Sequence, residues 1–213
     1  MRELLASFSI IAAAALICNC SDFEILRNTI PDKDCNPSTN PANFLPRGLL
    51  DLNHQVHEMQ PVYYMHPQVA NAYGVRLKEA VIRYEWLFGR ESLTTYGLGV
   101  LLGLEEGEFS VPLSGELKQV SGSDTSVVPF VEVIPPNVGT QLAMLYVDAK
   151  EFTLGIHLRL KGESEESNTF RYPLDFCWGC LDEICCPGEN EYYPACYPGQ
   201  DSNNLLPCQC PCN

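Results

Sequence analysis

The sequence predicts a mainly β protein: an antiparallel β-sandwich (immunoglobulin-like) with one short helix and a disulfide-stapled C-terminal tail. Three observations predict it. Apolar and polar residues alternate along several segments, as expected of strands that are buried on one face. Short turn signals separate these segments, as in sandwiches. Eight of the eleven cysteines lie between Cys177 and Cys212, a density typical of an oxidising compartment.

The alternation is clearest over 80–86, 152–161 and 170–176. One-sided burial of this kind fits antiparallel sheets better than a parallel sheet. A helix is expected where Asn137 is a candidate N-cap and the apolar residues that follow share one face. Further strand candidates are 48–53, 56–65, 108–113, 117–120 and 127–134.

Composition limits the function classes. Hydrophobic residues make up 46% of 213 residues, enough for a core, and the formal net charge is −14. An acidic chain without a run of Lys or Arg repels phosphate backbones and anionic lipid surfaces, so we predict no nucleic-acid partner.

Residues 1–17 read as a signal peptide. Arg2 supplies a positive start, and the uncharged run 4–17 is shorter than the roughly 20 residues that a spanning helix needs. The thiols that follow resemble a bacterial lipidation site, which we place at Cys18 (or Cys20). Ordinary secretion, with Ala13 and Ala15 forming the cleavage site, is the competing interpretation.

Four segments are therefore expected: the signal peptide 1–17, a lipid-site and Pro-rich tether over 18–46, a sandwich body over 47–176, and a Cys-rich disulfide tail over 177–213. Lipidation at Cys18 leaves an even number of other cysteines, which can pair completely. Besides Cys20, the predicted disulfide cysteines are Cys35, Cys177, Cys180, Cys185, Cys186, Cys196, Cys208, Cys210 and Cys212.

Other chemistry is weighed against simpler interpretations. Cys177 and Cys180 have zinc-ligand and redox C-x-x-C spacing, but export favours disulfides. A cluster of His54, His57 and His66 suggests an exported metal-dependent hydrolase, although zincin spacing is absent. The acidic stretch 162–168 suggests a Ca²⁺ site, against which we favour a solvated hairpin. On the polar face of its strand, His157 is expected to be solvated.

A family resemblance adds to this. The order of motifs resembles a group of exported lipoproteins that are abundant in myxobacterial-type proteomes and mostly carry no assigned function. The resemblance implies an envelope location and a β-rich body, and it supplies no catalytic residues. It rests on GLLDL at 48–52, FSVPLSG at 109–115, EVIPP at 132–136, ESNTFRYPL at 166–174, CWGCL at 177–181 and CYPGQD at 196–201.

The predicted function is that of an exported cell-envelope lipoprotein, a non-catalytic structural or interaction module without a cofactor. Its membrane contact is an N-terminal lipid anchor, in the outer membrane or periplasm, and its other partner is an envelope protein or a glycan; a secreted form is the alternative location. The alternative functions are a carbohydrate- or Ca-binding module and the metal-dependent hydrolase with the three-histidine cluster.

Overall fold

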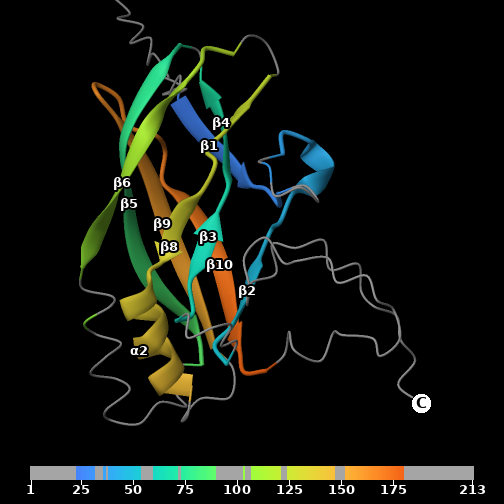
Figure 1. Cartoon of the computed structure of the whole chain (residues 1–213), viewed down its shortest axis with the longest axis vertical. Helices are drawn as coiled ribbons and strands as arrows, with labels where there is room; N and C mark the ends of the chain where they lie inside the picture. Colours follow the sequence, from blue (N-terminus) through green and yellow to red (C-terminus); the bar gives the residue numbers. More distant parts are fainter. Residues whose placement is uncertain are drawn as a thin grey trace, which may run out of the picture.

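The structure is a computed structural model that describes residues 23–31, 36, 38–53, 60–71, 73–89, 103, 107–120, 124–146 and 152–179. This part of the chain is mainly β, as predicted, with several sheets and the helix α2 (Figure 1). The elements in chain order are β1 (Phe23–Asn28), a 3-10 helix (Pro41–Asn43), β2 (Gly48–Asp51), β3 (Tyr63–Met65), β4 (Pro67–Asn71), β5 (Val75–Phe88), β6 (Glu108–Leu117), β7 (Ser126–Val127), β8 (Val131–Ile134), α2 (Pro136–Tyr146), β9 (Phe152–Gly162) and β10 (Phe170–Cys177).

The largest sheet has five strands in the order β2-β10-β9-β5-β6. Its long central strands are antiparallel, and β9 pairs with β5 on one side and β10 on the other. One pair differs from the antiparallel expectation: β2 runs parallel to β10, with Leu174 opposite Gly48. A parallel partner arises because β2 enters at the sheet edge from a distant part of the chain rather than through a hairpin.

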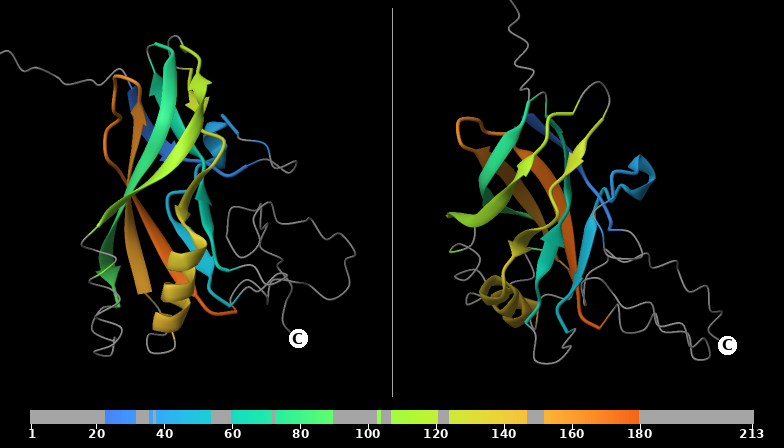
Figure 2. Two further views of the ribbon diagram at one scale, coloured as in Figure 1. Left: turned by 60° about the vertical axis from the view of Figure 1, so that its left-hand side comes forward. Right: turned by 45° about the horizontal axis from the view of Figure 1, so that its top comes forward.

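The other strands form two small sheets, β1-β4-β7 and β3-β8. Only His66 separates β3 from β4, and three residues separate β7 from β8. Each pair therefore continues in the same direction along the molecule. In Figures 1 and 2 these strands lie over one face of the five-stranded sheet. All their pairings are antiparallel.

A single apolar core joins the layers. The five-stranded sheet contributes alternate residues of β5, β9 and β10, and the small sheets contribute residues such as Phe23, Val69 and Val133. Two polar contacts cross between the layers within this core. Tyr84 Oη donates to the Val133 carbonyl at 2.7 Å, and the hydroxyls of Tyr63 and Tyr172 are 3.2 Å apart. Burial of both hydroxyl contacts fixes how the layers face each other.

The predicted helix is present as α2, and its predicted apolar face is buried, with Val138, Leu142 and Leu145 at most 7% exposed. The expected cap is wrong by position. Asn137 lies inside the first turn because the helix starts at Pro136, whose fixed φ suits that position. The carbonyl of Pro135 accepts from the first free amides instead.

Part of the predicted tether belongs to the body. Residues 23–28 form β1, and its Phe23 and Ile25 are 1% and 2% exposed. The tether predicted over 18–46 therefore does not include residues 23–28, because the side chains of Phe23 and Ile25 pack in the core. The candidates 108–113 and 117–120 also differ from the structure, in which β6 runs unbroken from Glu108 to Leu117.

Candidate functional site

The outer face of the five-stranded sheet carries the densest polar network in the described part of the chain. The inward positions of β9 are apolar, so its alternate residues His157, Arg159 and Lys161 point the other way. Acidic residues of the neighbouring strands and of the β9–β10 turn meet them. We call the charged face the set Arg47, Glu79, Arg83, Glu85, Glu108, His157, Arg159, Lys161, Glu166, Arg171 and Asp175.

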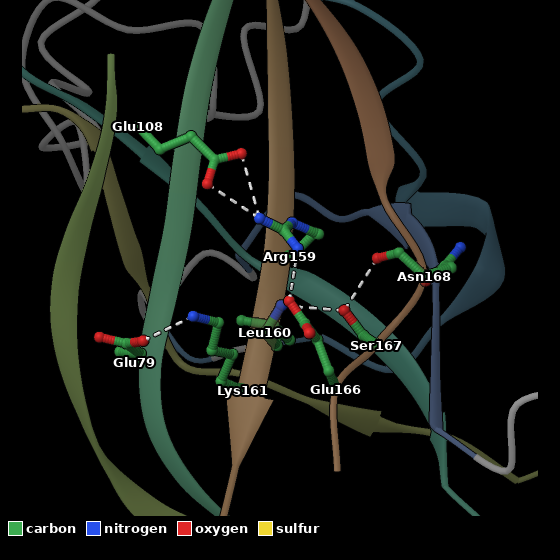
Figure 3. A network of polar contacts seen from close by, with 8 residues as sticks. All are labelled: Glu79, Glu108, Arg159, Leu160, Lys161, Glu166, Ser167 and Asn168. Atoms are coloured by element: carbon green, nitrogen blue, oxygen red, sulfur yellow. Dashed lines mark hydrogen bonds and ion pairs between the residues drawn. The ribbon is translucent and has the colours of Figure 1, made fainter.

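Arg159 lies at the centre of the charged face (Figure 3). Its Nη1 is 2.7 Å from Glu166 Oε1, and its Nη2 is 3.0 and 3.1 Å from the two oxygens of Glu108. One guanidinium thus joins β6, β9 and the β9–β10 turn. Beside it, Lys161 Nζ lies 3.0 Å from Glu79 Oε1. This contact and a hydrogen bond from Ser110 lower the pKa of Glu79.

His157 is not simply solvated, which corrects the sequence prediction. Its Nε2 is 2.7 Å from Glu85 Oε2, and Arg83 Nη2 approaches its Nδ1 at 3.5 Å. Arg171 also reaches Glu85, at 2.9 Å. The hydrogen bond from His157, then the positive charges around it, hold the pKa of Glu85 below its ordinary value.

A fourth contact lies where β2 meets β10. The Arg47 guanidinium grips the Asp175 carboxylate through two nitrogens, and its Nη2 is 2.6 Å from Oδ1. Thr153 donates to the same carboxylate at 2.5 Å. The hydrogen bond with Asp175 raises the pKa of Arg47 above its ordinary value. This fork-to-fork geometry orders the edge strand beside β10.

The charges of this face cancel. It holds five cations, each in contact with a carboxylate or with His157, and five carboxylates. The chain as a whole has a formal net charge of −14, so the excess negative charge lies elsewhere. Val81 sits within this face and is only 4% exposed, with Arg159 and Ser110 as its cross-strand neighbours. The long polar side chains around Val81 therefore cover this apolar residue.

The pair of His157 and Glu85 has one feature of a general base, a histidine oriented by a carboxylate. A working base needs a hydroxyl or water proton at its other ring nitrogen. Here that nitrogen faces Arg83, and a guanidinium is a permanent donor that gives up no proton. The pair of His157 and Glu85 links β9 to β5 across the sheet.

The predicted histidine cluster is only partly within view. His54 and His57 lie outside the described residues. His66 is 1% exposed, and burial lowers its pKa to about 4, against a smaller opposing effect of the Pro129 backbone. A ring that is buried in the core and stays neutral is not presented to a metal in solvent. Among the described residues, no group of three His, Cys, Asp or Glu side chains is arranged to hold a metal ion.

The acidic stretch 162–168 forms the turn between β9 and β10. This agrees with the hairpin that the sequence analysis favoured over a Ca²⁺ site. The Gly162 amide donates to the Glu165 carbonyl, and Ser167 Oγ accepts from the Leu160 amide at 2.8 Å. Asn168 reaches across to β1: its Oδ1 accepts from the Ile25 amide at 2.7 Å, and its Nδ2 donates to the Ile25 carbonyl at 3.1 Å. This contact could not be predicted from the sequence, because no local pattern around Asn168 indicates that it binds the backbone of Ile25, 143 residues earlier.

The predicted cysteine sites lie mostly outside the described residues; these are Cys18, Cys20, Cys35, Cys180, Cys185, Cys186, Cys196, Cys208, Cys210 and Cys212. Cys177 ends β10 and is disulfide-bonded. Asp51 lies opposite it in the sheet, and its Oδ1 accepts from the Gly179 amide at 2.8 Å. The first residues after β10 are therefore held against β2.

The acidic side chains of the charged face were also missed. Opposite charges do occupy outward positions of neighbouring strands, but which of them pair can be recognised only once the strand register is known. Within the described ranges, no helix has both the length and the apolar character to cross a bilayer. Comparison with known protein families and with curated proteins finds no match for this chain.

Proposed function

We propose that this chain is an exported cell-envelope lipoprotein, acylated at Cys18 or Cys20, whose body is a non-catalytic structural or interaction module. The export features of residues 1–17, the cysteine-rich tail and the resemblance to exported lipoproteins support the location. The disulfide at Cys177 fits an oxidising compartment. The body acts through its surface, and its partner is an envelope protein or a glycan.

We further propose that the body is an immunoglobulin-like β-sandwich. In immunoglobulin folds, strands A, B, E and D form one sheet, and C, F and G form the other, to which variable-type domains add C′. The orders β1-β4-β7 with β3-β8, and β2-β10-β9-β5-β6, agree with this scheme for A, B, E and for G, F, C, C′ if β3 with β4 is B and β7 with β8 is E. β2 is then an added edge strand beside β10, and strand D has no counterpart among the described strands. These strands carry no cysteine for the B–F disulfide; Trp86 of β5 instead stacks on Phe152 of β9, with ring centroids 5.0 Å apart.

The observation that carries the non-catalytic assignment is the charged face. It is an extended, charge-neutral array whose histidine, carboxylates and guanidiniums are bound to one another rather than aimed at an open position. Charged groups at protein contacts supply specificity and association rate more than raw affinity. The face is built on the long strands β5, β6, β9 and β10.

The location is tested by mass spectrometry of the mature protein from native membranes, without reduction. A diacylglyceryl mass on Cys18 or Cys20, with the remaining thiols oxidised, is expected. An unmodified N-terminus near Leu16 would show a secreted protein and rule out the lipid anchor.

The non-catalytic assignment has a separate test. Stoichiometric metal in protein purified without chelator, lost in the His57→Ala variant, would contradict that assignment.

The role of the charged face is tested by swapping charges within it. The double variant Glu79→Lys, Lys161→Glu retains an ion pair inside the protein but reverses the charge pattern that the face shows to a partner. Cross-linking in native membranes is expected to lose its main adduct in this variant. The control is Glu116→Lys with Lys118→Glu, an exposed swap off the charged face. Equal adducts in both variants would exclude the charged face as the contact surface.

A further inference from the structure

The first strand ties the N-terminal side of the body to one end of the sandwich. Phe23 lies opposite Asn71, at the point where β4 turns into β5. Its side chain is buried in the core, and the Ile25 backbone two residues later is held by Asn168. The start of β1 is thus part of the folded body, at the upper end of the molecule in Figure 1.

Covalent geometry then limits the anchor. An extended chain spans at most about 3.6 Å per residue, so Cys18, five residues before Phe23, lies within about 18 Å of it, and Cys20 within about 11 Å. The predicted tether of 18–46 allowed a far longer reach. We propose that the anchored body stands on the bilayer with the end that carries the start of β1 facing the lipid. This rests on the proposed acylation at Cys18 or Cys20.

The bilayer-facing end is formed by two chain turns and a strand end. They are the β4–β5 turn, the β9–β10 turn and the end of β6, and they line an open polar pocket of about 420 Å³. Asn71 ties two of them together, donating to the Tyr73 carbonyl at 2.9 Å and the Lys118 carbonyl at 2.7 Å. The pocket is lined by Tyr73, Gly74, Arg76, Glu116, Glu163, Ser164 and Glu165.

The short attachment is what makes the body stand rather than lie. The charged face on the flank of the sheet is charge-neutral, so it has no excess of cations to attract anionic lipid headgroups. The pocket rim at the lipid-facing end carries three glutamates and one arginine, so the covalent anchor, and not charge, holds that end near the bilayer.

The opposite end is then presented to the envelope. β5 has 14 residues, which at about 3.3 Å each spans roughly 40 Å from the lipid-facing turns to Phe88. Phe88 lies opposite Thr153, beside the pair of Phe152 and Phe176. Cys177, the first residue of the predicted tail, is at this end. The tail therefore begins at the membrane-distal end of the body.

Energy transfer to lipid tests the orientation. A fluorophore is attached through p-azidophenylalanine at Tyr73 or at Phe88, a matched pair of exposed aromatic sites (38% and 59% exposed) at opposite ends. The full acylated chain is reconstituted into vesicles that contain an acceptor-labelled headgroup. Transfer from position 73 is expected to exceed that from position 88 about twofold or more, because the ends are roughly 40 Å apart.

The mass of the same preparation separates the two possible failures. With a diacylglyceryl mass present, equal transfer from both sites or stronger transfer from position 88 overturns the orientation and leaves the lipoprotein assignment standing. Without that mass, the assignment and the orientation fail together. A Cys18→Ser, Cys20→Ser variant is the baseline and is expected to show no transfer at either site, at low and at high salt alike.

Discussion

At the scale of single residues, Gly139 shows how close packing overrides local preference. It lies in α2 with its Cα against the chain at Pro61, and a Cβ there would come within 1.8 Å of the Pro61 carbonyl oxygen. A helix interior otherwise favours alanine over glycine by about 1 kcal/mol. The two effects predict opposite signs for the same substitution, which makes the site informative.

We predict that Gly139→Ala lowers the free energy of unfolding by about 1–3 kcal/mol, the usual cost of overpacking. Urea unfolding of the purified protein measures it. Gly107→Ala is the control, because a Cβ there meets nothing within 4 Å. A variant at 139 that is as stable as the wild type, or more stable, would show that α2 does not pack against Pro61 in this way.

Protonation of His66 should change the free energy of unfolding measurably. Burial lowers its pKa in the folded protein from 6.5 to about 4. The unfolded chain therefore binds a proton below about pH 6.5, and the folded protein does so only near pH 4. The stabilisation is complete above pH 6.5 and is lost as the pH falls toward 4.

We predict that the free energy of unfolding falls by up to about 3 kcal/mol between pH 6.5 and 4, at 1.36 kcal/mol per pKa unit. The His66→Gln variant should show a shallower slope over that interval, whatever its absolute stability. Glu79 and Glu85, whose pKa values are lowered, lose their contribution at more acid pH. Parallel slopes in the two proteins would mean that His66 is not buried as a neutral ring.

At the scale of elements, β1 depends on a side chain that acts as a strand partner. β4 pairs with one edge of β1, and Asn168 satisfies both backbone groups of Ile25 on the other. The bond closes an edge that would otherwise expose backbone groups for pairing with another chain. It also couples the start of the body to the β9–β10 turn, 143 residues later.

We predict that Asn168→Ala destabilises the protein by about 1–3 kcal/mol, because two backbone groups lose their partners. The effect should be local: the amide of Ile25 should exchange with solvent much faster, while amides of β9 keep their protection. Ser164→Ala, in the same turn but exposed, is the control. Unchanged protection at Ile25 would disprove the clamp.

At the scale of the whole molecule, charge is unevenly distributed. The charged face is neutral and its ion pairs are only about 3 Å long, whereas the net charge of −14 is carried by the rest of the chain. Salt screens interactions beyond the Debye length, about 30 Å at 0.01 M and about 8 Å at 0.15 M, and affects close pairs less. Long-range repulsion is therefore the part that salt removes.

We predict that raising NaCl from about 0.01 to about 0.15 M increases the Tm, since screening relieves self-repulsion more than it weakens the short pairs. Thermal unfolding followed by circular dichroism measures this. Sucrose at matched osmolality controls for effects of solute exclusion. A Tm that falls with salt would show that the ion pairs of the charged face dominate the electrostatic stability.

The sequence by itself determined the local features. Alternation located β5, β9 and β10, and one apolar face located α2 and its buried Val138, Leu142 and Leu145, because side-chain periodicity directly reflects which side is covered. The polar, acidic composition of 162–168 located the turn between β9 and β10. The export signal, the lipid site and the disulfide tail remain predictions from the sequence.

Only the tertiary structure decided which segments meet. β1 lies in a polar, Pro-rich stretch that shows no strand pattern, and it pairs with β4. β2 pairs in parallel with β10, which is more than a hundred residues away. No local pattern predicts either pairing. The charged face and the contact of Asn168 with Ile25 depend on that register. Burial of His66 follows from layers that pack over it. Strand pairing and burial depend on contacts between residues far apart in the sequence, and local side-chain patterns do not show which distant segments will meet.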